Sequence, residues 1–389
     1  MTETDKYETA GLYIHIPFCL NKCRYCDFYS STDISLIKAY TKALSIEMDL
    51  TVTDPFVFDT IYFGGGTPSV MDVRDISKIF KSLYSFFSFS KDVEITLEAN
   101  PGTIFSQQLK EYISMGVNRI NIGIQSFQDI NLSFLGRVHS GQDGEAAIRW
   151  SRKAGFENLG IDLIYGLPNQ TLKSLLLDLR HAVEFDPEHL SCYMLTYESG
   201  TPLYKALQRG MFTPLADASL ARLFEETSIF LTDHGFTHYE ISNFARSWST
   251  NSKSNRSRHN CKYWSFKPYI GLGPSAHSFI GSKRYWNHKS LIKYLDRLNS
   301  GTLPIKGVEV LNKEQQMIEA IYLGLRKSEG IKIDEFNLTF GLSFKKLFKD
   351  VIIYLEDKGF IIIDKNYCTL SMKGMLFSDS VASMFINHM

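Results

Sequence analysis

A regular alternation of strand-like and helix-like segments is the feature that most constrains how this chain folds. Over the first 235 residues, short β-branched and aromatic runs alternate with amphipathic stretches, which is typical of βα units and a parallel sheet. The predicted helices lie at about 35–50, 72–87, 106–115, 143–154, 170–184 and 218–234. The predicted strands are Leu12–Ile16, Thr60–Phe63, Val93–Leu97, Arg119–Ile124, Gly160–Ile164 and Leu190–Leu195. Six such units favour an open or partial barrel over a complete barrel of eight.

The rest of the chain has a different character. Residues 236–310 are rich in Gly, Asn and Ser and are expected to form a layer of loops and strands laid over the barrel. In residues 311–389, helical patterns at 312–326, 333–338 and 343–358 precede a hairpin-like run, GFIIIDKNYCTLSMKG. The expected fold is therefore α/β, a partial (β/α)6 barrel over 1–235 and an overlay over 236–310, followed by a winged-helix-like α+β module over 311–389.

Composition excludes several classes of function. The 42 Lys+Arg balance the 42 Asp+Glu, so no global field attracts nucleic acid, and the lysines of 343–358 are interspersed with acids. A packing or docking role is preferred for that helix, and no nucleic-acid partner is expected. The N-terminal residues lack the basic start and apolar middle of a signal peptide, and no apolar run reaches the roughly 18 residues of a membrane span. A cytoplasmic location is the expectation.

Three of the six cysteines form the sharpest local signal. Cys19, Cys23 and Cys26 have the spacing C-x3-C-x2-C, and thiolates in such a short loop can hold a metal or the edge of a cluster. A closed zinc site wants four ligands, for which His15 is the nearest candidate. A four-iron cluster held by three thiolates leaves one iron open to a small molecule. Zinc and a chance group of unligated core cysteines remain as alternatives.

Polar residues follow or end each of the predicted strands. Because the carboxyl ends of parallel strands meet on one face of a barrel, these residues are expected to converge there. They are His15 and the three cysteines, Gly64–Thr67, Glu98 and Asn100, Gln125 and Ser126, Asp162, and Thr196–Glu198.

The cysteine motif resembles that of a known superfamily. The run YIHIPFCLNKCRYCDF, followed by FGGGTP at 63–68, is similar to the radical S-adenosylmethionine (SAM) superfamily. The resemblance implies a [4Fe–4S] cluster held by Cys19, Cys23 and Cys26, with SAM bound to the fourth iron through its amino and carboxylate groups. It also implies the partial (β/α)6 barrel that the alternation predicts.

Further motifs narrow the resemblance to the anaerobic coproporphyrinogen III oxidase-like group. IHIPFC, LEANPGT, IGIQSF, LGRVHS, GIDLIYGLPNQT and IGLGPSAHS match its pattern between about 12 and 280. Glycines would let the backbone approach SAM, Glu98 would hold its ammonium group and Arg137 its carboxylate. A tight turn at GGGTP and structural ion pairs of Arg137 or Asp162 are the alternatives. The residues implied around SAM are Tyr13, Tyr25, Gly65, Gly66, Thr67, Glu98, Gln125, Arg137 and Asp162.

Two functions share this scaffold, and one position separates them. The coproporphyrinogen dehydrogenases have a fourth cysteine, C-x3-C-x2-C-x-C, where this chain has Phe28. The missing cysteine argues against a decarboxylase. The run C-D-F instead resembles the heme-chaperone group named HemW, as does His259-Asn260-Cys261-Lys262-Tyr263-Trp264, which matches the H-N-x-x-Y-W motif of that group.

The H-N-x-x-Y-W segment offers chemistry that suits a heme. His259 is a candidate axial ligand of the iron, Cys261 a competing thiolate, and the neighbouring cations at 256, 258 and 262 would pair with propionates. A solvated, hydrogen-bonded loop is the alternative.

The resemblance as a whole implies a heme chaperone. Such a protein would bind heme, a [4Fe–4S] cluster and SAM and deliver heme to an acceptor protein, which the sequence does not identify. Membrane association is expected only through that acceptor, and the sequence does not specify the oligomeric state. The competing reading is an oxygen-independent coproporphyrinogen III dehydrogenase of porphyrin biosynthesis, in which SAM is cleaved during decarboxylation.

Overall fold

A single mixed sheet organises most of the chain. The computed structural model describes residues 9–51, 56–247 and 254–389. The sheet has 12 strands, which lie in this spatial order: β12 (Ile305–Val310), β11 (Lys283–Asn287), β10 (His277–Ile280), β9 (Tyr269–Leu272), β1 (Thr9–Ile16), β2 (Val57–Gly65), β3 (Phe89–Ala99), β4 (Arg119–Gln125), β5 (Leu159–Tyr165), β6 (His189–Met194), β8 (Asn243–Arg246) and β7 (Phe236–Glu240).

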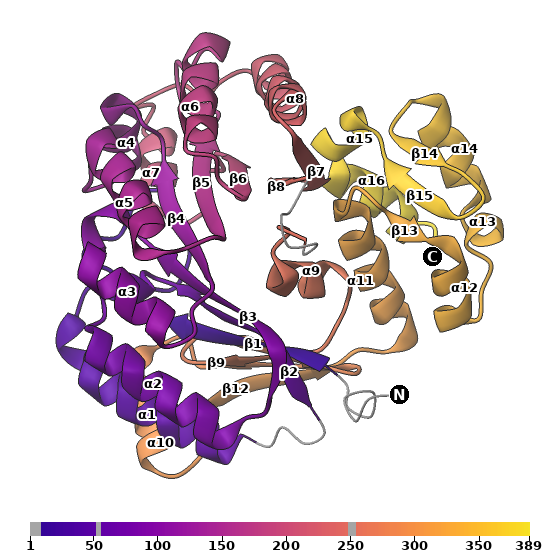
Figure 1. The fold of residues 1–389 in the computed structure, drawn as a ribbon. Coiled ribbons are helices and arrows are strands. Elements are labelled where there is room, and N and C mark those ends of the chain that lie inside the picture. The colour runs from indigo at the N-terminus through magenta and orange to yellow at the C-terminus, as the bar shows by residue number, and fades with distance from the viewer. Residues whose placement is uncertain (1–8, 52–55, 248–253) are drawn as a thin grey trace.

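The six predicted strands are confirmed as β1 to β6. They are neighbours in chain order and pair in parallel, and Figure 1 shows them curving into an open ring with helices outside. The partial (β/α)6 barrel expected from the alternation is therefore present. Its helices are α1 (Ile37–Leu50), α2 (Val73–Phe86), α3 (Ser106–Ser114), α4 (Asp129–Leu135), α5 (Gly141–Ala154), α6 (Leu172–Glu184), α7 (Pro202–Gln208) and α8 (Asp217–Asp233).

Side-chain alternation along the strands separates an apolar shell from a polar interior. In β1, Leu12, Ile14 and Ile16 are fully buried towards the helices, whereas Tyr13 and His15 point into the ring. The helices begin where side chains can cap them. Capping boxes start α5 at 140–143 and α6 at 171–174. The polar residues of the sequence motifs are thus gathered inside the barrel.

Residues 236–310 extend the sheet instead of covering it. Strands β7 and β8 add antiparallel to β6, whereas β9 adds parallel to β1 and is followed by β10, β11 and β12. These strands therefore continue the sheet and do not form the expected overlay. The physical reason is that both edges of a partial barrel carry unpaired backbone N–H and C=O groups, with which further strands can form hydrogen bonds. Two helices complete this region, α9 (Arg258–Trp264) and α10 (Leu291–Asn299).

The C-terminal module has its own core. A three-stranded antiparallel sheet is surrounded by helices, and the buried residues from 317 to 385 form a cluster separate from that of the barrel. The predicted hairpin is confirmed as β14 and β15. The elements are α11 (Lys313–Arg326), β13 (Ile331–Lys332), α12 (Ile333–Phe340), α13 (Phe344–Leu347), α14 (Lys349–Asp357), β14 (Ile361–Ile363), β15 (Tyr367–Leu370), α15 (Met372–Leu376) and α16 (Ser378–Ile386).

One helix of this module differs from its prediction. The pattern at 343–358 predicts a single helix, but the chain breaks at Phe348 into α13 and α14. The break allows the buried Phe348 ring to pack against Phe344 and Phe385 at centroid distances of 5.0 and 5.2 Å. Core packing therefore overrides the helical continuity of the sequence.

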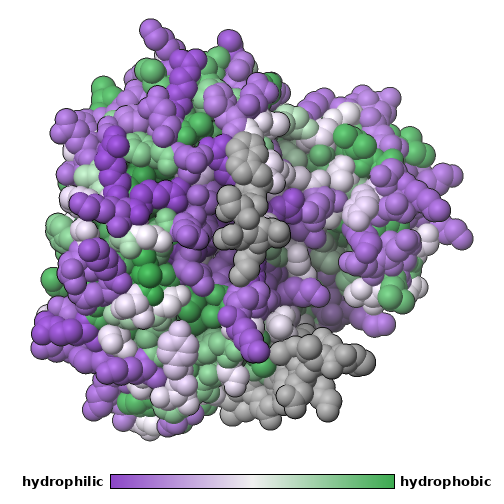
Figure 2. Space-filling model, viewed as in Figure 1, coloured by the Kyte–Doolittle hydropathy of each residue, from purple (hydrophilic) through white to green (hydrophobic). Residues whose placement is uncertain are grey.

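One face of the molecular surface is mostly hydrophilic. Figure 2 shows a face on which hydrophilic residues predominate and hydrophobic ones form small, separated areas. Within the described ranges, none of the helices has both the length and the apolarity needed to cross a bilayer.

Candidate functional site

The cysteine loop follows β1 and is held by distant parts of the chain. Its first cysteine, Cys19, donates its backbone N–H to Ser31 O at 3.0 Å. Further along, Arg24 N donates to Leu135 O at 3.1 Å, and Arg24 O accepts from Leu203 N at 2.9 Å. All three cysteines of the loop are free thiols. The loop therefore takes its shape from α4 and α7, not from local secondary structure.

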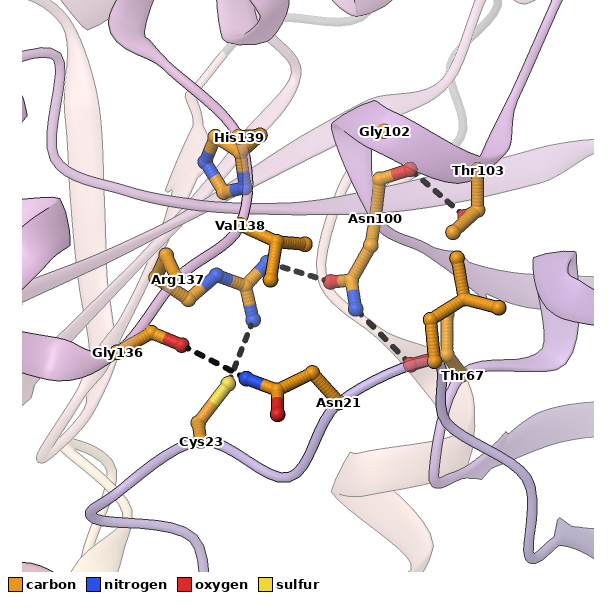
Figure 3. A pocket seen from close by; sticks show the side chains of 11 residues that line it. Asn21, Cys23, Thr67, Asn100, Gly102, Thr103, Gly136, Arg137, Val138 and His139 are labelled. Atoms are coloured by element: carbon orange, nitrogen blue, oxygen red, sulfur yellow. Dashed lines mark hydrogen bonds between the residues drawn. The ribbon is translucent and has the colours of Figure 1, made fainter. Parts of the chain in front are cut away.

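A hydrogen-bond network joins the loop to the ends of β2, β3 and β4. The Thr67 hydroxyl donates to Cys19 Sγ at 3.4 Å and accepts from Asn100 Nδ2 at 2.9 Å. Arg137 donates to Asn100 Oδ1 at 2.6 Å and to Cys23 Sγ at 3.5 Å. These residues line one pocket, in which Figure 3 shows the Arg137 guanidinium between Cys23 and Asn100. The expected convergence at the carboxyl ends of the strands is confirmed for these side chains.

The glycines after β2 make a cradle that side chains would fill. A Cβ at Gly65 would lie 2.6 Å from the His15 ring, and the φ angle of Gly65 is +105°, in the region that favours glycine. A Cβ at Gly66 would lie 2.7 Å from Phe18 O, which is backbone. The GGGTP run thus packs directly against the strand and loop that lead to Cys19.

Two carboxylates stand inside the barrel. Glu98, at the end of β3, accepts a hydrogen bond from the Tyr62 hydroxyl at 2.7 Å, and burial raises its pKa to about 7. Asp162, in β5, accepts from Asn121 Nδ2 at 2.7 Å, and burial raises its pKa as well. Among the described residues, neither carboxylate forms an ion pair, and each accepts a hydrogen bond from a neutral side chain.

Several buried polar atoms in the same region have no hydrogen-bond partner among the residues that the structure describes. They are Gln125 Oε1, Asp162 Oδ1 and Arg137 Nε. Gln125 also has a positive φ of 67°, a conformation that is uncommon outside glycine and often marks a functional site. The polar interior thus offers two oxygen acceptors and one guanidinium donor. A ligand with hydroxyl, ammonium and carboxylate groups could bind to them. The residues present therefore fit SAM.

Two tyrosines implied around SAM are already engaged by the protein. The Tyr13 hydroxyl lies 3.1 Å from His15 Nδ1, and the Tyr13 ring stacks on Tyr62 at 6.2 Å. Tyr25 packs against a small apolar cluster that includes Leu135 and Ile164. Tyr25 thus lies on the loop between Cys23 and Cys26 with one side against the protein. Its contact with SAM stays a prediction.

The cysteines do not converge on one point. In the described part of the chain, no group of three or more His, Cys, Asp or Glu side chains could hold a single metal ion. A zinc site needs ligands that meet at about 2 Å from one ion, whereas each cysteine of a [4Fe–4S] cluster binds a different iron. Burial raises the pKa of Cys26 to about 11, so a cation must be present for this residue to act as a thiolate. The donor set fits a cluster better than zinc.

Known proteins resemble this chain over nearly its whole length. A family model for the radical SAM superfamily matches residues 13–182, and one for the HemN C-terminal domain matches residues 311–377. The heme chaperone HemW of Bacillus subtilis is 34% identical over 381 residues, which cover 97% of this chain and 99% of that protein. The chain belongs to the HemW family. The heme chaperone HemW of Lactococcus lactis is 32% identical, with 96% of each chain covered.

A solved structure shares the HemW-family fold. Coproporphyrinogen III oxidase (HemN) from Escherichia coli superposes with a TM-score of 0.83, at 23% identity, over 98% of this chain and 91% of that one. At this identity the match shows the fold alone. Membership of the radical SAM superfamily implies a [4Fe–4S] cluster and SAM.

The H-N-x-x-Y-W motif lies in helix α9. His259 is 1% exposed, and both ring nitrogens are engaged, Nδ1 with the Thr60 hydroxyl at 2.9 Å and Nε2 with the Tyr263 hydroxyl at 2.8 Å. Ligation of heme iron by His259 would require the loss of one of these hydrogen bonds. Cys261, on the same helix, is partly exposed, and burial raises its pKa to about 11.

The cations of this segment are paired within the protein. Lys262 Nζ lies 2.8 Å from Asp59 Oδ1, and Arg258 lies 3.2 Å from an Asp92 carboxylate oxygen. Arg256 pairs with a glutamate of the C-terminal module. The fold thus brings an acid to each of these three cations, and their pairing with heme propionates stays a prediction.

Some residues of the HemW-family site were not predicted. Asn100 was noted at a strand end but given no role, although it links Thr67 to Arg137. Tyr62 was missed altogether. Its signal was available, because in β2 it alternates with Thr60 and Gly64 and so faces the barrel interior. The exposed Phe28 lies with 69% of its surface accessible at the position of the absent fourth cysteine.

Proposed function

We propose that this protein is a heme chaperone that binds heme, a [4Fe–4S] cluster and SAM, and that it delivers heme to an acceptor protein in the cytoplasm. The observation that carries the proposal is the full-length relationship to proteins named heme chaperone HemW. Phe28 supports it, since the side chain at this position offers no fourth thiol.

The cluster and SAM would be held by the residues of the cysteine loop and the barrel interior. Cys19, Cys23 and Cys26 would ligate three irons. Glu98 would accept from the SAM ammonium group and Arg137 would donate to its carboxylate, while the open oxygens of Gln125 and Asp162 face the same interior. When bound, the two groups supply one-electron and radical chemistry.

A second function competes because the fold is shared with coproporphyrinogen III oxidase (HemN). As an oxygen-independent dehydrogenase, the chain would oxidatively decarboxylate two propionates of coproporphyrinogen III. Anaerobic turnover with reductant and SAM distinguishes the two functions. The chaperone should give no protoporphyrinogen while it binds heme, and accumulation of that product would establish the enzyme.

Heme binding is tested directly by anaerobic titration. Heme added to the reconstituted protein should produce a saturable shift of the Soret band. The sequence offers His259 and Cys261 as alternative iron ligands, so the shift should be reduced by His259→Ala or by Cys261→Ala if the substituted residue ligates the iron. Absence of saturable binding to the unsubstituted chain would refute the chaperone. Transfer is measured by mixing the loaded protein with an apo-hemoprotein acceptor and following the Soret band of the acceptor.

A further inference from the structure

Helix α9 forms a floor across the interior of the barrel. The backbone N–H of His259 donates to Glu94 Oε1 at 3.1 Å, and the backbone N–H of Arg258 donates to Glu94 Oε2 at 3.2 Å. A Cβ at Gly11 would lie 3.1 Å from the His259 ring. Glu94, Thr60 and Gly11 all precede, on their strands, the residues that face SAM. This floor, helix α9, therefore lies at the end of the barrel opposite the cysteine loop. Figure 1 shows α9 between the barrel strands and α11.

An unbroken series of contacts leads from this floor to the proposed SAM site. The His259 ring stacks on the Tyr62 ring with centroids 5.2 Å apart and an interplanar angle of 28°. The Tyr62 hydroxyl then donates to Glu98 Oε1 at 2.7 Å. Successive barrel-facing residues lie one layer apart, so Tyr62 stands one layer above Thr60, level with Thr96, and Glu98 stands two layers above Glu94. The floor residue thus touches the side chain that holds the carboxylate.

The His259 ring is held in one orientation. Thr60 bonds one nitrogen and Tyr263 the other, and the two rings of Tyr263 and His259 meet edge to face at 5.0 Å. Burial lowers the pKa of His259 to about 3, so the imidazole stays neutral and serves as one donor and one acceptor. A ring fixed on both edges is suited to fixing a neighbour and poorly suited to an exchangeable ligand.

We propose that His259 is a positioning residue of the SAM site, which acts by holding the Tyr62 ring so that its hydroxyl orients Glu98 towards the SAM ammonium group. This inference rests on the SAM binding of the proposed function. It gives His259 a role in cofactor binding that is separate from heme ligation.

The central test compares His259→Leu with His259→Phe. Leucine removes the ring and both hydrogen bonds and should weaken SAM binding about tenfold, which corresponds to the loss of an aromatic pair and a misplaced hydrogen bond. Phenylalanine restores the stacking on Tyr62 and should recover most of the affinity. SAM binding is measured by anaerobic equilibrium dialysis on protein with matched iron and sulfide content. Asn260→Ala, on the same helix, is the matched control and should bind SAM like the unsubstituted chain.

A double-mutant cycle identifies the route of the effect. Tyr62→Phe removes the hydroxyl that reaches Glu98 and should itself weaken SAM binding about tenfold. If His259 acts through Tyr62, His259→Leu should add less than about twofold in the Tyr62→Phe background. Full additivity would overturn the inference, as would unchanged SAM affinity of His259→Leu.

Heme titration of the same variants separates this inference from the proposed function. Saturable heme binding that survives in His259→Leu while SAM binding falls supports the positioning role. Loss of heme binding with unchanged SAM affinity makes His259 a heme ligand and overturns it. If the unsubstituted, cluster-containing chain binds no SAM, the SAM arm of the proposed function fails, and the inference fails with it.

Discussion

Substitution of Gly66 by alanine tests how closely the cysteine loop depends on the GGGTP run. The added methyl group would lie 2.7 Å from Phe18 O and 2.9 Å from Ile16 O, and both are backbone atoms that cannot rotate away. The same backbone makes two hydrogen bonds here, Gly66 N to Ile16 O at 2.8 Å and Thr67 N to Phe18 O at 2.7 Å. Forcing a methyl group into such a site costs about 1–3 kcal/mol.

Gly102 provides the matched control for this prediction. It lines the pocket that Thr67, the neighbour of Gly66, also lines, but nothing lies within 4 Å of the Cβ that alanine would add. Thermal unfolding of the cluster-free proteins should show a lower Tm for Gly66→Ala, by about 2–4 °C for each kcal/mol, and an unchanged Tm for Gly102→Ala. Reconstituted Gly66→Ala should also retain less iron, because Thr67 moves away from Cys19. Equal Tm values and equal iron contents for the two variants would refute the reasoning.

Three other substitutions examine the site, a buried acid and the C-terminal module. Arg137→Lys should weaken SAM binding in anaerobic dialysis about tenfold, since one ammonium group cannot replace a guanidinium that bonds a carbonyl, an amide and a thiol at once; wild-type affinity would contradict this. Burial raises the pKa of Glu47 to about 7, so the free energy of unfolding should fall as pH rises from about 5 to 8, by up to about 3 kcal/mol, and Glu47→Gln should lose that fall in denaturant titrations. Parallel pH profiles would exclude the assignment. Arg326→Met should cost about 2 kcal/mol in the same titrations because it leaves the buried Glu240 unpaired, whereas the exposed pair removed by Lys332→Met should cost less than about 1 kcal/mol; equal losses would count against it.

The barrel and the polar residues at the carboxyl ends of its strands could be predicted from the sequence, because both depend on short stretches of residues. Strand positions depend on short apolar runs, and the polar residues that end those runs must meet on one face of a parallel barrel. Cys19 and Thr67 were placed together on this basis and Arg137 by the family resemblance, and the structure joins the three through hydrogen bonds that include Asn100. Asn100, the link between them, carries no spacing signal of its own.

Features that depend on long-range packing could not be predicted. The segment around His259 was expected to be a heme-binding loop, yet it forms a short helix in which His259 is buried, with partners such as Thr60 that lie some 200 residues earlier. The cations beside His259 were expected to pair with heme propionates, because the sequence does not show which acids lie next to them in the fold. Only the folded chain brings Asp59 to Lys262.

The position of β1 in the middle of the sheet sets the order in which this protein can be completed. This strand pairs with β2 on one side and with β9, at Tyr269–Leu272, on the other. During synthesis, which proceeds from the N-terminus, the strand that leads into the cysteine loop therefore keeps one edge unpaired until about 270 residues have been made. Arg24 likewise waits for Leu135 and Leu203. The loop and the strand that leads into it therefore gain all the partners of the folded protein only late in translation.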